Sequence, residues 1–242
     1  METKKKEMTL IPVKYMARSN EQGNIMTLKF KVPEGFSWTE GSHIHLAFND
    51  FLGKSGPDKS KVRALSIMSQ VSESFIGVTT RIPEDGSAYK RRLLDLQEGD
   101  EMLMFKVGNR MELTRANRPL VLISMGVGMA TFRPLILAYN QNSEGINHLT
   151  SLNVDSGDSF LYREQLDSLN IKGFNNHYAG SRQELYKMID QYLQADDNAI
   201  YYVVGSDAFL KKIIGYLKEK QIAESDIIID KKAELRLEIM ED

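Results

Sequence analysis

Two glycine segments in the second half of the chain come directly after runs of apolar residues. Gly126 and Gly128 follow 119–125, and Gly205 follows 199–204. Glycine lets the backbone turn tightly and lets a phosphate or a ring approach without a Cβ in the way. A helix that begins at such a turn offers free N–H groups to an anion. These segments indicate a nucleotide site, and a tight turn without a ligand is the alternative interpretation.

Serine stands at the start of two expected helices. Ser87 follows Gly86 and begins the stretch 86–93, and Ser206 precedes a helix expected over 208–220. A serine hydroxyl accepts hydrogen bonds from the first N–H groups of a helix, and a helix start also suits a diphosphate. In each case helix capping alone is a sufficient explanation.

Arginine and serine occur together on an expected strand of the first half. Arg63, Ala64, Leu65 and Ser66 alternate, which places Arg63 and Leu65 on one face and Ala64 and Ser66 on the other. A guanidinium can hold a pyrophosphate through two parallel hydrogen bonds, and the Ser66 hydroxyl can bond to a ring heteroatom. The alternative is an arginine that simply faces solvent.

Other chemistries have less support. The chain has no cysteine, which removes disulfides, thiolate nucleophiles and sulfur-ligated metal sites. His43 and His45 share one strand face, but no third ligand of matching placement accompanies them, so no metal site is expected. No nucleophile motif of the hydrolase type occurs.

Composition narrows the class of protein. Of the 242 residues, 31 are Lys or Arg and 33 are Asp or Glu, a balance that does not predict nucleic-acid binding. No apolar stretch approaches the roughly 18 residues of a membrane span. The first residues carry positive charge without an apolar run after them, so no signal peptide is expected. We therefore expect a cytoplasmic protein without membrane insertion.

The elements that must position these residues differ between two halves. Short alternating runs predict strands in the first half, namely 26–32, 43–48, 62–69, 75–82 and 101–107. Continuous apolar runs in the second half alternate with helical stretches, which is typical of a parallel sheet. The sequence predicts an antiparallel β-barrel over 1–114, followed by a doubly wound α/β domain over 115–242.

Taken in order, these segments resemble the ferredoxin–NADP reductase family, in which a flavin-binding barrel precedes a nucleotide-binding α/β domain. The similarity runs from about Gly35 to Ile229. The matching segments are 38–44 at the barrel entry, 63–66, 86–93 with 99–100 after it, 122–133, 181–182 and 203–206.

The resemblance implies the cofactors FAD (or FMN) and NADPH or NADH, and a hydride passed to the flavin and then to an acceptor, which can be a separate protein. It assigns Arg63, Gly86 and Ser87 to the flavin diphosphate and Ser66, the catalytic candidate, to the flavin ring. The other implied flavin and nicotinamide nucleotide contacts are Ala64, Leu65, Gly126, Gly128, Thr131, Ser181, Arg182, Gly205 and Ser206.

Three positions depart from the family pattern. Leu65 replaces the tyrosine that stacks on the flavin, Thr131 replaces a proline, and Val204 replaces a cysteine near the nicotinamide. A charged tail over 233–242 stands where the family has an acidic residue and an aromatic. Two alternatives therefore stay open: a non-redox binding module that kept the fold, and a reductase component that serves a separate haem or iron–sulfur protein.

Overall fold

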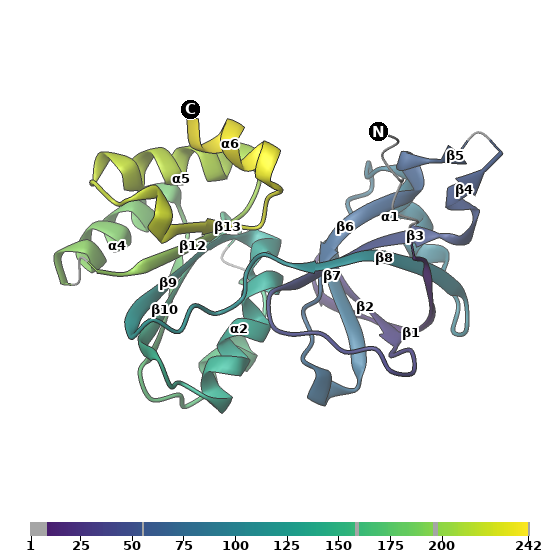
Figure 1. Cartoon of the computed structure of the whole chain (residues 1–242), viewed down its shortest axis with the longest axis horizontal. Coiled ribbons are helices and arrows are strands. Elements are labelled where there is room, and N and C mark those ends of the chain that lie inside the picture. The colour runs from purple at the N-terminus through teal and green to yellow at the C-terminus, as the bar shows by residue number, and fades with distance from the viewer. Residues whose placement is uncertain (1–8, 55, 158–159, 196–197, 242) are drawn as a thin grey trace, which may run out of the picture. The chain divides into compact units, whose positions relative to one another are not determined.

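The computed structural model describes residues 9–54, 56–157, 160–195 and 198–241 (Figure 1). Contacts divide the chain into two compact units, Met1–Asn109 and Arg110–Asp242. The boundary predicted from the sequence lies between residues 114 and 115.

The first unit is a curled antiparallel sheet. Its six strands, in the order β6-β3-β8-β1-β2-β7, are β1 (Ile11–Gln22), β2 (Ile25–Lys31), β3 (Ser42–Phe48), β6 (Val62–Ser66), β7 (Phe75–Arg81) and β8 (Glu101–Asn109). The two edge strands approach each other beyond the end of β6, where the Met68 N–H donates to the Gly77 carbonyl at 2.8 Å. The sheet is therefore a partly closed barrel, and the predicted fold class is confirmed for this half.

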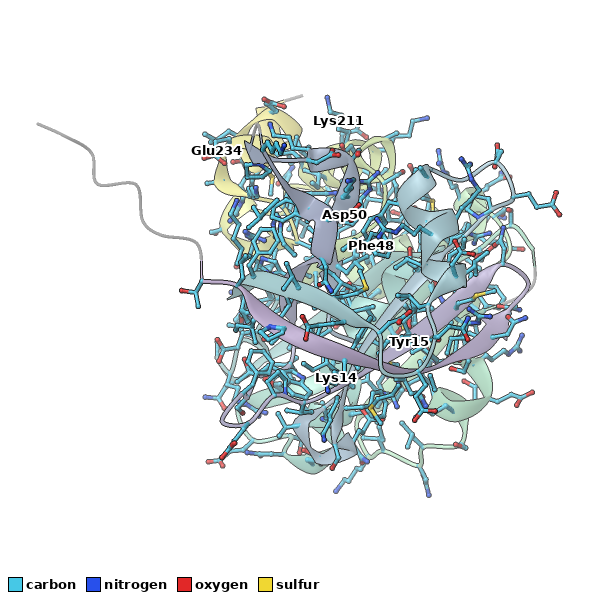
Figure 2. The ribbon with its side chains drawn as sticks, turned by 90° about the vertical axis from the view of Figure 1, so that its right-hand side faces the viewer. Lys14, Tyr15, Phe48, Asp50, Lys211 and Glu234 are labelled. Carbon is cyan, nitrogen blue, oxygen red and sulfur yellow. The ribbon has the colours of Figure 1, made fainter. Side chains whose placement is uncertain are left out.

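Alternation along the strands fills the barrel. On β1, Tyr15 is buried while Lys14 is exposed (both residues are labelled in Figure 2). The Trp38 indole N–H donates to the Ser69 carbonyl at 2.8 Å, which satisfies a buried polar group at the rim. Shorter elements complete the unit: β4 (Leu52–Gly53), β5 (Gly56–Pro57), α1 (Ala88–Arg92) and the 3₁₀ helices η1 (Asn49–Phe51), η2 (Lys59–Lys61), η3 (Val71–Glu73) and η4 (Leu93–Asp95).

The second unit is a parallel sheet with helices on both faces. Its strands, in the order β11-β10-β9-β12-β13, are β9 (Arg118–Met125), β10 (Ile146–Val154), β11 (Phe174–Ala179), β12 (Ile200–Val204) and β13 (Ile227–Ile229). The connecting elements are η5 (Gly126–Gly128), α2 (Met129–Gln141), α3 (Arg163–Asp167), α4 (Arg182–Ala195), α5 (Asp207–Glu219), η6 (Glu224–Asp226) and α6 (Ala233–Glu241). The predicted doubly wound α/β fold is confirmed.

Burial explains why β9 and β12 read as continuous apolar runs. Residues 200–204 are all buried, because helices cover the sheet on both sides. Figure 1 shows α4 and α5 on one face of the sheet and α2 on the other. Within the described residues, no helix has the length and apolarity required to cross a membrane.

The tail after β13 differs from expectation. We read 233–242 as a charged tail, whereas the structure forms α6 there. Ile239 and Met240 on this helix are buried in the core shared with α5, and the Lys218 ammonium donates to the Met240 carbonyl at 2.6 Å. Tertiary packing, rather than an amphipathic stripe in the sequence, holds this helix.

A buried tyrosine fastens the start of the second unit to its sheet. The Tyr202 hydroxyl donates to the Glu112 carbonyl and accepts from the Thr114 N–H, both at 2.8 Å. It also lies 2.8 Å from the Thr114 hydroxyl. One side chain on β12 therefore orders the segment that leads into β9.

Removing that hydroxyl tests its role. We expect Tyr202→Phe to lower the free energy of unfolding by about 1 to 2 kcal/mol, because two backbone groups lose their partner. Chemical denaturation measures the change. Tyr186→Phe is the matched control, since the Tyr186 hydroxyl has no hydrogen bond to another described residue and its ring packing on Tyr216 is kept. Equal effects of the two variants would contradict the assigned role.

Candidate functional site

Arg63 on β6 is held by backbone oxygens. Its Nη1 donates to the carbonyls of Lys59, Ser60 and Val62 at 3.2, 3.3 and 2.6 Å. Its Nη2 reaches the Ser87 hydroxyl at only 3.5 Å. The guanidinium is thus fixed in place while part of its donor capacity is left for another group. The two segments that the sequence assigned to a diphosphate, 63–66 and 86–93, come together here.

Positive charge gathers at this point without an internal counter-charge. Burial lowers the pKa of Lys90, and repulsion from Arg63 and Arg81 lowers it further. Among the residues that the structure describes, no carboxylate pairs with Arg63 or Lys90. A cation that is partly buried and unpaired is costly, so the arrangement favours an anionic ligand.

The other basic residues of α1, Arg91 and Arg92, make hydrogen bonds within the protein. Arg92 donates to the Asp50 carboxylate at 2.7 Å and lies 4.0 Å from the centre of the Phe48 ring (both are labelled in Figure 2). Arg91 donates to the Gly86 carbonyl. Of the basic run 90–92, only Lys90 stays available.

The buried Tyr89 packs against Arg63 of the cluster. Its hydroxyl donates to the Leu46 carbonyl at 2.9 Å, and burial raises the pKa of this phenol. The Arg63 guanidinium lies 5.1 Å from the centre of its ring, within the range of a cation–π contact. Neither Tyr89 nor Lys90 was singled out from the sequence, although both lie inside the segment 86–93.

The remaining residues of the strand motif divide between core and surface. Leu65 packs against the core of the barrel, Ala64 is exposed, and Ser66, the last residue of β6, is half-buried. Gly86 has a structural reason of its own, because a Cβ there would lie 2.8 Å from the Pro83 carbonyl oxygen. The close turn that delivers Ser87 to Arg63 therefore requires glycine.

The glycines of the second unit lie where the order of the sheet changes direction. From β9 the chain proceeds outward to β10 and β11, and then it returns to the other side of β9 to form β12 and β13. Ligands in open parallel sheets bind at the carboxyl ends of the strands beside such a reversal. Gly126 and Gly128 follow β9, and Gly205 follows β12.

Close packing explains these glycines. Gly126 has φ +53°, and a Cβ on Gly128 would lie 2.9 Å from the Val204 carbonyl oxygen. A Cβ on Gly205 would lie 2.5 Å from the Phe209 ring. Backbone conformation therefore favours glycine at 126, and close contacts favour it at 128 and 205, with or without a ligand; the three glycines also leave backbone unobstructed at the strand ends.

Hydroxyl groups near these turns have definite structural roles. Ser206 caps α5 by accepting from the Phe209 N–H at 3.3 Å, which is the capping that the sequence indicates. Thr131 lies in the first turn of α2 and is buried.

Ser181 and Arg182 lie at the carboxyl end of the edge strand β11, on the far side of β10 from the glycines. Ser181 accepts from the Glu184 N–H at 3.2 Å, and Glu184 accepts from the Gly180 N–H at 2.7 Å. This reciprocal capping fixes the start of α4. Both side chains of the pair 181–182 are exposed.

Asp230 follows β13, which is the edge strand opposite β11, and it too lies at the carboxyl end of its strand. Its Oδ1 atom is buried and has no hydrogen-bond partner among the described residues. Burial raises the pKa of this carboxyl group, against the opposing effect of the adjacent Lys231, whose ammonium pairs with Asp207 at 2.9 Å. The sequence marks this acid only by its place after the last strand.

A curled antiparallel sheet followed by a parallel sheet in the order β11-β10-β9-β12-β13 is the fold of the ferredoxin–NADP reductases. No protein-family profile matches the chain, and a comparison with curated protein sequences finds no match. The fold is therefore recognised from solved structures.

Three of these solved structures illustrate the likeness. A ferredoxin NADP+ reductase from Neisseria gonorrhoeae with bound FAD and NADP has a TM-score of 0.78 at 18% identity, covering 92% of this chain and 98% of that one. Ferredoxin-NADP+ reductase from Plasmodium falciparum with 2'P-AMP has a TM-score of 0.71 at 20% identity, covering 90% and 94%. The CS-b5R domains of human Ncb5or in the NAD+ form have a TM-score of 0.74 at 14% identity, covering 95% and 71%.

Substitution of Gly128 tests the packing at the reversal of the sheet. Gly128→Ala should lower the free energy of unfolding by about 1 to 3 kcal/mol, because the new Cβ meets a backbone oxygen that has little room to move. Thermal and chemical denaturation measure the loss. Gly215→Ala, in open space on α5, is the matched control and should raise stability by about 0.5 to 1 kcal/mol. A stabilising Gly128→Ala would refute the close approach.

Proposed function

We propose that this chain is a flavoprotein reductase that takes a hydride from NAD(P)H onto a bound flavin and passes the electrons to an acceptor protein or small molecule. The observation that carries the proposal is the positive cluster of Arg63 and Lys90 beside Ser87, with which no carboxylate of the described residues pairs. The solved reductase from Neisseria gonorrhoeae, which has the same fold, contains bound FAD and NADP.

The first unit binds the flavin in this proposal. Arg63 and Ser87 hold its diphosphate, and Lys90 adds positive charge. A diphosphate site favours FAD over FMN, which carries one phosphate. Ser66 donates a hydrogen bond to the flavin ring, and Leu65 with Ala64 provides an apolar contact where the family resemblance implies an aromatic one.

The second unit binds the nicotinamide nucleotide. Gly126, Gly128 and Gly205 leave the strand ends open to it, with Thr131 and Ser206 at the starts of the adjoining helices. Ser181 and Arg182 bind a 2′-phosphate, which favours NADPH over NADH. The bound cofactors supply the hydride and electron chemistry, and the protein supplies position and charge.

A visible spectrum of the purified protein tests the proposal. A bound flavin colours the protein yellow, and NADPH added without oxygen should bleach it. The variant Arg63→Lys should bind added FAD about tenfold or more weakly, because lysine lacks the fork that grips a diphosphate. Quenching of flavin fluorescence measures the affinity.

Arg115→Lys is the matched control for that variant. Arg115 also donates to backbone carbonyls, those of Glu144 and Asn142, but it lies in the second unit. FAD affinity should be unchanged in this variant. A colourless protein that takes up neither FAD nor FMN would instead support a non-redox binding module. Reduction of a cytochrome by the isolated chain would identify an electron-transfer component.

Nucleotide preference tests the role of Arg182. Arg182→Ala should raise the KM for NADPH at least about tenfold and leave that for NADH unchanged, because a charge-assisted bond to the 2′-phosphate is lost. Steady-state kinetics with both nucleotides gives the ratio. Lys187→Ala, an exposed basic residue on the same helix, is the control. Equal changes for both nucleotides would reject 2′-phosphate binding at this residue.

A further inference from the structure

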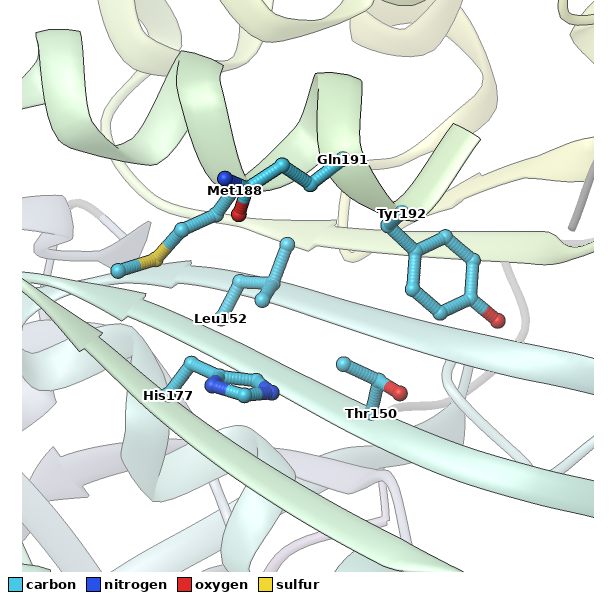
Figure 3. Close-up of a pocket in the computed structure, with 6 residues that line it drawn as sticks. All are labelled: Thr150, Leu152, His177, Met188, Gln191 and Tyr192. Atoms are coloured by element: carbon cyan, nitrogen blue, oxygen red, sulfur yellow. The ribbon is translucent and has the colours of Figure 1, made fainter. Parts of the chain in front are cut away.

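A cavity opens on the parallel sheet, between the edge of the sheet and α4 (Figure 3). It has a volume of about 190 Å³. Three side chains come from the sheet and three from the helix, and together they are Thr150, Leu152, His177, Met188, Gln191 and Tyr192.

The cavity exists because the edge strand lacks a covering helix on this face. Leu152 and His177 are register partners on β10 and β11, so their side chains share a face. On α4, Leu185 and Ile189 pack into the core of the sheet, which leaves His177 exposed. The other face of β11 is covered, since Tyr178 donates to Asp167 of α3 at 2.7 Å.

Three polar side chains converge on the cavity. Thr150 is only 2% exposed, yet its hydroxyl makes no hydrogen bond to another described residue. The His177 ring and the Gln191 amide are exposed, so water can satisfy them when the cavity holds no ligand. A nearly buried hydroxyl without a partner is unfavourable, so a ligand that bonds to it is stabilised.

The residue types that line the cavity indicate what kind of ligand fits. None of these six lining residues is Asp, Glu, Lys or Arg; Leu152 and Met188 offer apolar contact, and the rings of His177 and Tyr192 offer flat surfaces. Tyr192 is held in place by its hydroxyl, 2.8 Å from Nε2 of His148. A charged ligand would find no counter-charge here.

We propose that this cavity binds a small uncharged planar ring that carries an amide-like donor and acceptor. Size agrees with one ring, because an apolar cavity of about 150 Å³ takes up benzene. The carboxamide would bond to the Thr150 hydroxyl and the Gln191 amide, with the ring beside Met188 and Leu152.

This site is separate from the one proposed for the nicotinamide nucleotide. Thr150 and His177 lie within their strands, and Gln191 and Tyr192 lie toward the carboxyl end of α4. Ser181 and Arg182 lie at the opposite end of that helix. The inference therefore stands whether or not the chain is a reductase.

Benzamide is the probe, and the histidines report its binding. The chain has four histidines, of which His43 and His45 belong to the first unit. Titration of the full chain with benzamide, followed by proton NMR, should shift the Cε1–H signal of His177 saturably, with a Kd of about 1 mM. The signals of His43 and His45 should stay in place. The variant His177→Gln assigns the signal.

Variants and charged analogues decide the outcome. Gln191→Trp fills the cavity from the exposed side and should abolish the shift, whereas Gln194→Trp, exposed on the same helix but outside the cavity, should retain it. Thr150→Val should weaken binding about tenfold through loss of the hydroxyl. A linear shift without saturation, an unchanged response in Gln191→Trp, or equally tight binding of benzoate or benzamidine would overturn the proposal.

Discussion

The approach of the turn after β9 to the end of β12 sets the geometry of the parallel unit. Because Gly128 lies against the Val204 carbonyl, η5 and α2 begin directly beside the neighbouring strand. The two strand ends on either side of the reversal are thereby brought into contact. The candidate nucleotide residues Gly126, Gly128 and Gly205 depend on that contact for their common location.

In the barrel, backbone groups position the charge of Arg63. A short turn through Gly86 brings Ser87 to Arg63, and backbone carbonyls orient the guanidinium without neutralising it. Asp50 takes up Arg92 and Lys61 instead. Among the described residues, the neighbouring cations Lys61 and Arg92 have a carboxylate partner, whereas Arg63 and Lys90 have none.

Sequence reasoning succeeded where burial leaves a regular pattern. The run 119–125 predicted β9 because both faces of that strand are covered, and period-two alternation predicted β2 and β3. The alternation of β1 stops after Tyr15, where the first register shift interrupts the pairing of β1 with β2. α6 was missed because packing on α5, rather than a helical stripe, defines it.

The sequence predicted the candidate site around Arg63 only in part, because some of its features depend on contacts between distant segments. Motif order brought Arg63 and Ser87 to attention as a pair, and the structure places them 3.5 Å apart. The importance of Lys90 follows from the partners that Arg91 and Arg92 find elsewhere, which no local pattern encodes. The cavity beside α4 likewise depends on where that helix crosses the sheet.

The depressed pKa of Lys90 has a consequence for how this protein behaves in solution. Any small multivalent anion that settles between Lys90 and Arg63 relieves their repulsion and competes by mass action with a larger ligand. Phosphate and sulfate buffers would occupy the cluster, and added salt would screen it over a Debye length of about 8 Å at physiological ionic strength. The affinity of the cluster for a proposed diphosphate ligand would therefore depend on the buffer anion and on the salt concentration.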